Sequence, residues 1–94
     1  LRAVRESDGF AAAVADQEIQ AAQEEIAKRE GLLMCPEGAA TLAAMIRTAK
    51  EGRIGKEDQV VLYNCGSGLK YPMPAADAAL DRHQPIDYGA LMKA

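Results

Sequence analysis

The sequence predicts an α/β fold: a fragment of a parallel three-layer α/β/α sheet, in the order strand, helix, strand, helix, strand, followed by a C-terminal tail. Three short apolar runs predict the strands, and the two longer stretches between them have the apolar spacing of helices. Strands that alternate with helices of this length are normally parallel, so we expect right-handed crossover connections.

The predicted strands cover residues 10–15, 32–35 and 60–63. Each is a run of apolar residues between glycine, proline or polar residues, and a run this short between such boundaries is typical of a buried strand. The third run is the clearest because it begins with two β-branched valines.

The first predicted helix covers residues 17–30, with Asp16 as its N-cap and Gly31 as its stop. The second begins at Pro36 or Glu37 and ends at Lys50. Its apolar residues recur at helical spacing along one face, at Leu42, Met45, Ile46 and Ala49.

Composition excludes several classes of protein. The chain has 94 residues, a formal charge of −3 and 27% charged residues, which argues against a nucleic-acid binder that relies on bulk positive charge. No apolar run approaches the roughly 18 residues of a membrane helix. The core is rich in alanine and poor in aromatic residues, and two cysteines provide no disulfide framework and no metal-binding pattern. We therefore expect a marginally stable domain, or one that is stabilised by packing against a partner surface.

Both ends of the chain are informative. Residues 1–7 read as the end of a helix, so we expect the chain to be a piece of a longer protein. Beyond Pro72 a weak helical pattern covers residues 75–82. An apolar patch follows at Tyr88, Leu91 and Met92, which would suit docking on a partner.

Ligands of open parallel sheets bind at the carboxyl ends of strands, where this sequence has Asp16, residues 35–37 and residues 64–68. The last segment, NCGSG, is rich in glycine and lets backbone N–H groups approach a ligand, although a plain turn is the more common explanation of such a segment. The segment is not a phosphate-binding P-loop, because the GK[ST] ending is missing. It is not a dinucleotide-binding fingerprint either, because the third glycine is absent.

Single residues leave alternatives open. Glu37 lies in the first turn of a helix, where its charge either stabilises the helix dipole or faces a ligand. Cys35 reads as a small buried hydrophobic residue, whereas Cys65 lies in the glycine loop, and a pair with His83, the only histidine, would make it a nucleophile. Lys70 reads as a solvated loop lysine.

Two segments carry a family resemblance. Residues 35–44, CPEGAATLAA, and residues 60–72, VVLYNCGSGLKYP, resemble the C-terminal part of threonine synthase. The resemblance covers residues 1–72, which would be the C-terminal portion of the large pyridoxal-phosphate-binding domain, and residues 73–94 would be a tail. It implies a pyridoxal-phosphate enzyme of the tryptophan-synthase-β-like fold. That enzyme converts O-phosphohomoserine and water to threonine and phosphate by γ-elimination followed by β-addition of water.

The resemblance also implies roles for individual residues. A Ser or Thr of the family faces the pyridine nitrogen of the cofactor, and the matching position here is Cys65, whose thiol is a weaker donor than a hydroxyl. Residues Gly66, Ser67 and Gly68 would form the wall beside the ring, and Glu37 would lie near it. The Schiff-base lysine of the family belongs to upstream sequence and is not Lys70, so no catalytic residue is expected in this chain.

Two alternatives remain at this level. One is a serine/threonine dehydratase or cysteate synthase of the same fold, and another is a non-catalytic α/β interaction module. For threonine synthase we expect a cytoplasmic protein that binds a small-molecule substrate, without nucleic acid, membrane or metal. Self-association, or docking to the missing N-terminal part, would supply the rest of the pocket.

Overall fold

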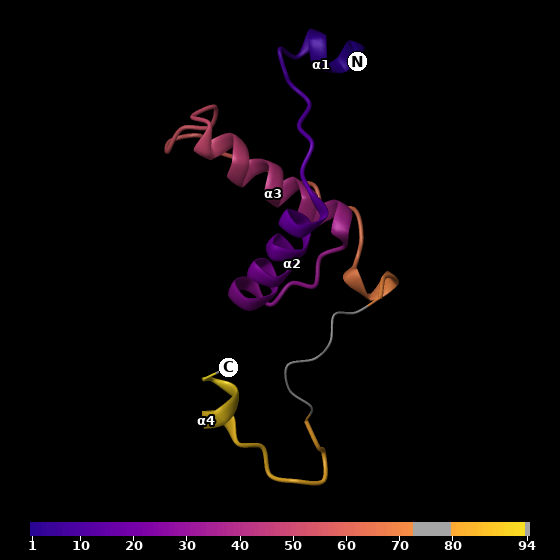
Figure 1. The fold of residues 1–94 in the computed structure, drawn as a ribbon, viewed down its shortest axis with the longest axis vertical. Helices are drawn as coiled ribbons and strands as arrows, with labels where there is room; N and C mark the ends of the chain where they lie inside the picture. The colour runs from indigo at the N-terminus through magenta and orange to yellow at the C-terminus, as the bar shows by residue number, and fades with distance from the viewer. Residues whose placement is uncertain (73–79, 94) are drawn as a thin grey trace.

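The structure is a computed structural model that describes residues 1–72 and 80–93 (Figure 1). Two long helices, α2 and α3, form its centre, and shorter helices lie towards the two ends of the chain. The elements in chain order are α1 (Arg2–Glu6), α2 (Asp16–Glu30), α3 (Pro36–Lys50), the 3-10 helix η1 (Gly68–Lys70) and α4 (Tyr88–Leu91).

Local sequence accounts for both ends of α2. Its N-cap is Ala15, whose backbone N–H donates to the Glu18 carboxylate at 2.7 Å, so Asp16 is the first helical residue and its prediction as the N-cap was wrong by one position. Gly31 ends the helix in the left-handed conformation, with φ of 67°, where a residue without Cβ carries no steric penalty. The predicted stop at Gly31 is therefore confirmed.

Helix α3 has the boundaries that the sequence predicts. Pro36 occupies its first turn, where the missing N–H costs nothing, and Glu51 follows its last residue. Cys35 is the N-cap, and its sulfur accepts a hydrogen bond from Gly38 N–H at 3.3 Å. Arg47 and Lys50 lie in the last turn, where positive charge is favourable.

Small residues hold α2 and α3 together. The buried cluster between them consists of alanines, and larger side chains pack only at its edge. Because alanine has one methyl group, the helices approach closely but bury little area per residue. This is the thin, alanine-rich core that the composition predicts. The buried members are Ala22, Ala39 and Ala43, and those at the edge are Val14, Ile19 and Leu42.

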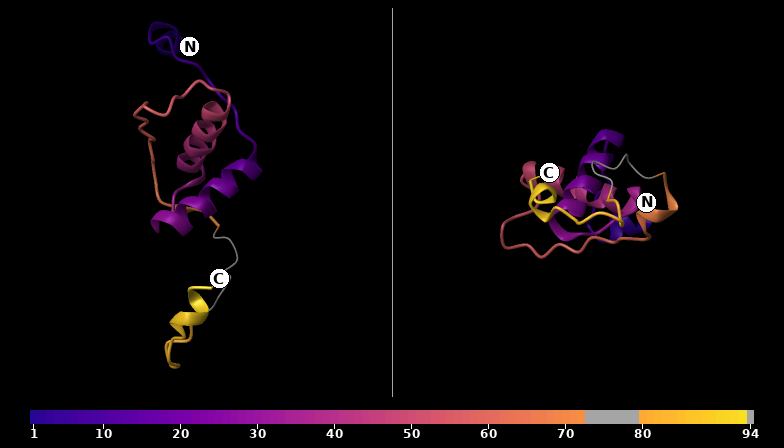
Figure 2. Two further views of the ribbon diagram at one scale, coloured as in Figure 1. Left: turned by 90° about the vertical axis from the view of Figure 1, so that its left-hand side faces the viewer. Right: turned by 90° about the horizontal axis from the view of Figure 1, so that it is seen from below.

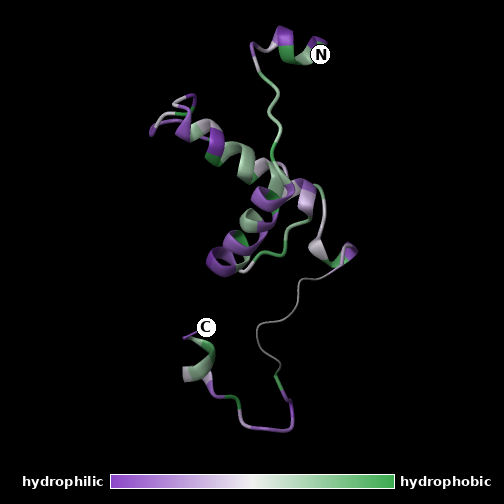
Figure 3. Cartoon of the chain, in the orientation of Figure 1, coloured by the Kyte–Doolittle hydropathy of each residue, from purple (hydrophilic) through white to green (hydrophobic). Residues whose placement is uncertain are grey.

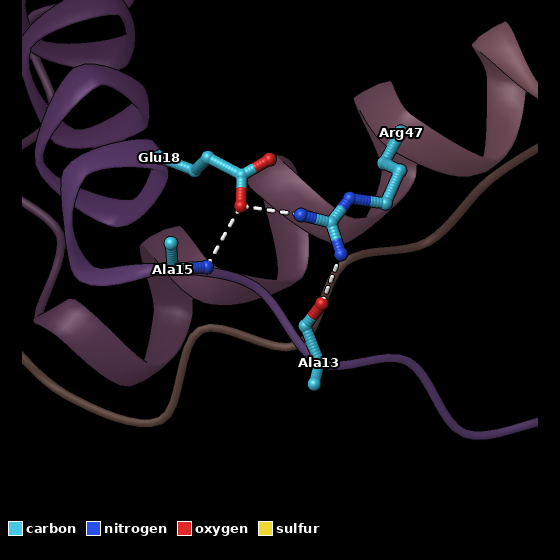
Figure 4. A network of polar contacts seen from close by, with 4 residues as sticks. All are labelled: Ala13, Ala15, Glu18 and Arg47. Atoms are coloured by element: carbon cyan, nitrogen blue, oxygen red, sulfur yellow. Dashed lines mark hydrogen bonds and ion pairs between the residues drawn. The ribbon is translucent and has the colours of Figure 1, made fainter.

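One ion pair joins the two helices at the start of α2 (Figure 4). Arg47 of α3 donates from Nη2 to Glu18 Oε2 at 2.5 Å, and from Nη1 to the Ala13 carbonyl oxygen. The same Glu18 oxygen accepts the Ala15 N–H. The pKa of Glu18 is lowered, first by that backbone hydrogen bond and then by Arg47. A single carboxylate therefore caps α2 and fixes it against α3.

The predicted three-layer α/β/α sheet is wrong. Within residues 1–72 and 80–93 there is no strand, and the β-pairing consists of one isolated antiparallel bridge between Met34 and Ser67. Residues 10–15, 32–35 and 60–63 are not strands of a parallel sheet, and no crossover connection links them. Much of their apolar surface is exposed, including Phe10 (50%), Val61 (80%) and Tyr63 (84%).

The sheet prediction failed because a strand forms only when a second segment of chain pairs with it. Apolar runs report the local preference of the backbone, whereas a ladder needs a second chain segment that supplies donors and acceptors at the right spacing. Residues 32–35 pair with such a segment at one position, Met34 with Ser67. Among the described residues, the runs 10–15 and 60–63 pair with no other segment. Figure 3 shows the hydrophobic character of the segment between α1 and α2, beside the more hydrophilic α2.

The chain after α3 returns to the start of that helix. It turns at residues 55–58, where Asp58 N–H donates to the Gly55 carbonyl at 3.2 Å. It then runs back along α3, as the left view of Figure 2 shows. The glycine loop, residues 64–68, thereby reaches the N-terminus of α3.

The C-terminal part of the chain differs from the sequence-based expectation where it is described. Of the helical pattern predicted over residues 75–82, positions 75–79 lie outside the described residues, and positions 80–82 are not helical. The patch at Tyr88 and Met92 is exposed, at 70% and 86%. No helix of the described chain combines the length and apolar character that crossing a membrane demands.

Candidate functional site

The glycine loop is attached to the segment that precedes α3. Gly68 N–H donates to the Leu33 carbonyl at 3.0 Å, and Cys35 N–H donates to the Gly66 carbonyl at 3.4 Å. The Met34–Ser67 bridge lies between these two bonds. Gln23 of α2 also donates to the Met34 carbonyl at 3.0 Å, so α2 supports the same segment. The loop is therefore placed by backbone hydrogen bonds at the start of α3.

Two of the glycines in this region are sterically different. A Cβ at Gly68 would lie 2.8 Å from the Met34 carbonyl oxygen and 2.8 Å from Leu33 Cγ, which leaves no room for a side chain. A Cβ at Gly66 would meet Cys35 Sγ at 3.8 Å, an ordinary contact. Close approach of the backbone thus requires glycine at position 68, whereas position 66 has space.

Cys35 lies at the centre of the site. Its side chain is buried, with 1% of its surface exposed, and its sulfur contacts three groups. It accepts from Gly38 N–H, donates to Asn64 Oδ1 at 3.6 Å, and lies 3.7 Å from Cys65 Sγ. Either sulfur can be the donor in the contact between the two thiols.

Cys65 is exposed, in contrast to Cys35. The hydrogen bond with Cys35 raises the pKa of the Cys65 thiol, and desolvation and the negative charge of Glu37 act in the same direction. Cys65 therefore presents a protonated thiol, which is a neutral hydrogen-bond donor, at the surface of the glycine loop.

Glu37 and Tyr71 form the polar edge of the site. The Tyr71 hydroxyl donates to Glu37 Oε1 at 2.5 Å. This bond lowers the pKa of Glu37, and the backbone N–H of Glu37 adds to the effect. The same bond raises the pKa of Tyr71 to about 12. Around neutral pH the pair consequently holds one carboxylate and one neutral phenol.

The structure brings the predicted site residues together. Cys65, Gly66, Ser67 and Gly68 lie in one loop against the first turn of α3, where Glu37 stands. The Ser67 hydroxyl accepts from Leu69 N–H at 3.2 Å and caps η1. These residues therefore lie at one place, the start of α3.

Other candidates are not brought to this loop. Among the described residues, the polar partner of Cys65 is Cys35 rather than His83, whose Nε2 accepts from Arg82 at 3.2 Å. Asp16 begins α2. A groove of about 610 Å³ lies between α2 and α3, beside Ala22 and Ala43, and none of the predicted site residues lines it.

Sequence reasoning placed Cys35 and Asn64 within candidate ligand-binding segments but gave neither a role in the site, and it missed Tyr71. The contacts of these residues join positions 29 to 34 apart in the chain, at Asn64–Cys35, Cys65–Cys35 and Tyr71–Glu37. No local periodicity reports contacts at that separation.

Comparison with known proteins defines the class. A family model described as pyridoxal-phosphate dependent enzyme matches residues 1–66. The chain belongs to this family of pyridoxal-phosphate dependent enzymes.

Within the family, the similarity is to threonine synthases. The chain is 37% identical over 79 residues to threonine synthase of Methanocaldococcus jannaschii, covering 84% of this chain and 20% of that protein. It is 40% identical over 77 residues to threonine synthase of Methanosarcina acetivorans, covering 82% of this chain and 19% of that protein. A Bacillus threonine synthase is 36% identical over 84 residues, covering 89% of this chain and 23% of that protein.

These comparisons confirm the resemblance to threonine synthase that the two motifs predict. The chain spans about a fifth of the length of these curated relatives.

Proposed function

We propose that this chain is the C-terminal part of a threonine synthase, which uses pyridoxal phosphate to convert O-phosphohomoserine and water to threonine and phosphate. The observation that carries the proposal is the similarity to threonine synthases at 37% and 40% identity over more than four-fifths of the chain. Residues 1–72 would belong to the large cofactor-binding domain, and residues 73–94 would form its tail.

The residues at the glycine loop fit one side of a pyridine ring. Cys65 offers an exposed, protonated thiol, and Gly66 has no side chain that would cover it. Cys65, Gly66, Ser67 and Gly68 would hold and shape this side of the cofactor, with Glu37 near the ring. When bound, pyridoxal phosphate supplies an electron sink that stabilises carbanions.

The proposed task of Cys65 is to orient the cofactor without changing its charge. A neutral thiol donates a hydrogen bond to the ring nitrogen but does not force a proton onto it, as a carboxylate would. The hydrogen bond from Tyr71 to Glu37 supports this arrangement because it occupies one carboxylate oxygen at the edge of the site. Glu37 is then held in place at the edge of the site.

We further propose that these 94 residues do not catalyse the reaction by themselves. By the resemblance, the site residues of this chain would form one wall of the cofactor pocket, and the lysine that binds the cofactor would belong to upstream sequence. Titrating pyridoxal phosphate into the purified chain should leave the absorbance spectrum that of free cofactor. A stable spectrum of bound cofactor would refute this part of the proposal.

The activity itself is tested with the complete protein. Supplied with pyridoxal phosphate and O-phosphohomoserine, it should release phosphate and threonine in equal amounts. Threonine and serine, offered separately, should not be consumed. Formation of a 2-oxo acid from either of them, without turnover of O-phosphohomoserine, would identify a dehydratase instead and contradict the proposal.

A further inference from the structure

The two cysteines of the chain are placed as a pair. Their sulfurs lie 3.7 Å apart, both are free thiols, and the sequence contains no other cysteine. The Cys35 N–H bond to the Gly66 carbonyl holds the two backbones beside each other. A disulfide needs the sulfurs at about 2 Å, so closure requires only a small movement of the side chains.

The pair is asymmetric in a way that suits stepwise oxidation. Cys65 is exposed, whereas Cys35 is 1% exposed and is covered by the loop. A solute oxidant therefore meets Cys65 first. The sulfur of Cys35 is already in contact with the sulfur that would be oxidised, as a resolving cysteine must be. Because the contact with Cys35 raises the pKa of the Cys65 thiol, oxidation should accelerate above the usual thiol range of about pH 8.5.

We propose that Cys35 and Cys65 are a redox modification site, which a peroxide converts to an intramolecular disulfide and a thiol reductant restores. The deprotonated Cys65 sulfur attacks the peroxide, the O–O bond breaks, and Cys65 becomes a sulfenic acid. The hydroxide that leaves takes up the proton lost by the Cys65 thiol and becomes one water. The Cys35 sulfur then attacks Cys65 Sγ, the S–O bond breaks, and the hydroxyl leaves with the Cys35 proton as a second water. Two thiols and one hydrogen peroxide thus give one disulfide and two waters.

The disulfide would tie the glycine loop covalently to the N-cap of α3. It would also remove the thiol proton of Cys65, so this residue could no longer donate a hydrogen bond. The effect on cofactor binding rests on the proposed function, in which that proton faces the ring nitrogen. Formation of the disulfide does not rest on it, because both sulfurs are placed by this chain alone.

The test is to treat the full reduced chain with hydrogen peroxide and follow it by intact mass and thiol counting, without cofactor. We expect both free thiols to be lost together, the mass of two hydrogens to disappear, and a reductant to restore both. Peptide mapping should join the segment that contains Cys35 to the one that contains Cys65. Chains linked to one another, or irreversible oxidation of Cys65 while Cys35 stays free, would overturn the proposal.

Two controls separate proximity from general reactivity. Cys35→Ser keeps an acceptor for Gly38 N–H but removes the resolving sulfur, so the sulfenic acid of Cys65 should persist and no disulfide should form. In the wild type, resolution should be at least about tenfold faster in the folded chain than in urea, because folding brings the sulfurs together. Equal rates in both states would show that the contact plays no part, and would overturn the proposal.

Discussion

The hydroxyl of Tyr71 donates to Oε1 of Glu37 at 2.5 Å, which joins the chain beyond the glycine loop to the first turn of α3. The two residues are 34 positions apart in the sequence. This bond fixes the chain just after the glycine loop, while the Cys35–Gly66 and Gly68–Leu33 backbone bonds fix the loop itself.

The bond should contribute to stability only within a window of pH. It lowers the pKa of Glu37 from the ordinary 4.5, so its contribution is present above that value and is lost as the pH falls through the lowered pKa. It raises the pKa of Tyr71 from 10 to about 12, so its contribution is present below pH 10 and is lost as the pH rises through about 12.

Titration of the tyrosinate absorbance tests this assignment. The difference between wild type and Tyr71→Phe isolates Tyr71, and it should titrate at about pH 12. Glu37→Gln should move that midpoint down towards 10, whereas Glu24→Gln, on the exposed side of α2, should leave it in place. A titration midpoint that stays unchanged in Glu37→Gln would mean that the bond does not form in solution.

The reactivity of Cys65 should depend on Cys35. The contact with the Cys35 sulfur is the main cause that raises the pKa of Cys65, and Glu37 adds a smaller rise. Since the thiolate is the reactive form, alkylation of Cys65 should accelerate only above the usual thiol range of about pH 8.5. Cys35→Ala should shift the pH–rate profile to lower pH, and Glu37→Gln should shift it by less.

The groups that face Cys65 define the controls for this profile. Cys35, the N-cap of α3, and Glu37 in its first turn act on Cys65, and Tyr71 interacts with Cys65 from the chain beyond the loop. The Lys70 ammonium lies 4.0 Å from the position of a Cβ at the neighbouring Gly66. Lys70→Gln therefore needs its own profile beside Cys35→Ala. An unchanged profile in Cys35→Ala, with intact helical circular dichroism, would contradict the sulfur–sulfur contact.

The two loop glycines should respond differently to the same substitution. Gly68→Ala places a methyl group 2.8 Å from a backbone oxygen, and such overpacking typically costs about 1–3 kcal/mol of the free energy of unfolding. Gly66→Ala meets only ordinary contacts and should change stability by less than about 0.5 kcal/mol. Urea unfolding of both variants measures the difference, and equal costs would show that Gly68 is not closely packed.

The core between α2 and α3 should tolerate no added volume. Ala39 is fully buried in the alanine cluster, so Ala39→Leu should separate the helices and cost about 1–3 kcal/mol. Ala49 lies on the exposed side of α3, and Ala49→Leu should cost less than about 0.5 kcal/mol. Thermal unfolding compares them; a well-tolerated Ala39→Leu would mean that α2 and α3 do not pack through this face.

The helices could be predicted from sequence because their boundaries are local. Gly31 ends α2 because its backbone adopts the left-handed conformation. Pro36 begins α3 because a residue without an N–H fits the first turn of a helix. The predicted sheet failed because the apolar run 60–63 carries no information about its partner. Residues Val61 and Tyr63 lie exposed instead of pairing in a ladder.

The site was predictable only in part, for the same reason. Motif resemblance selected Cys65, the glycines and Glu37, and the structure gathers them at the start of α3. Cys35 was correctly predicted to be buried, but its contact with Cys65 depends on how the chain returns after α3. The hydrogen bond of Tyr71 to Glu37 depends on the same return of the chain, and no spacing rule in the sequence predicts it.

The most direct test of the account measures the affinity of the complete protein for pyridoxal phosphate. If the Cys65 thiol donates to the ring nitrogen, Cys65→Ala should weaken binding by roughly 2- to 10-fold, the value of one hydrogen bond. Cys65→Ser should retain the affinity, and Leu69→Ala, an exposed neighbour, should not alter it. Unchanged affinity in Cys65→Ala would contradict the assignment of this loop to the cofactor.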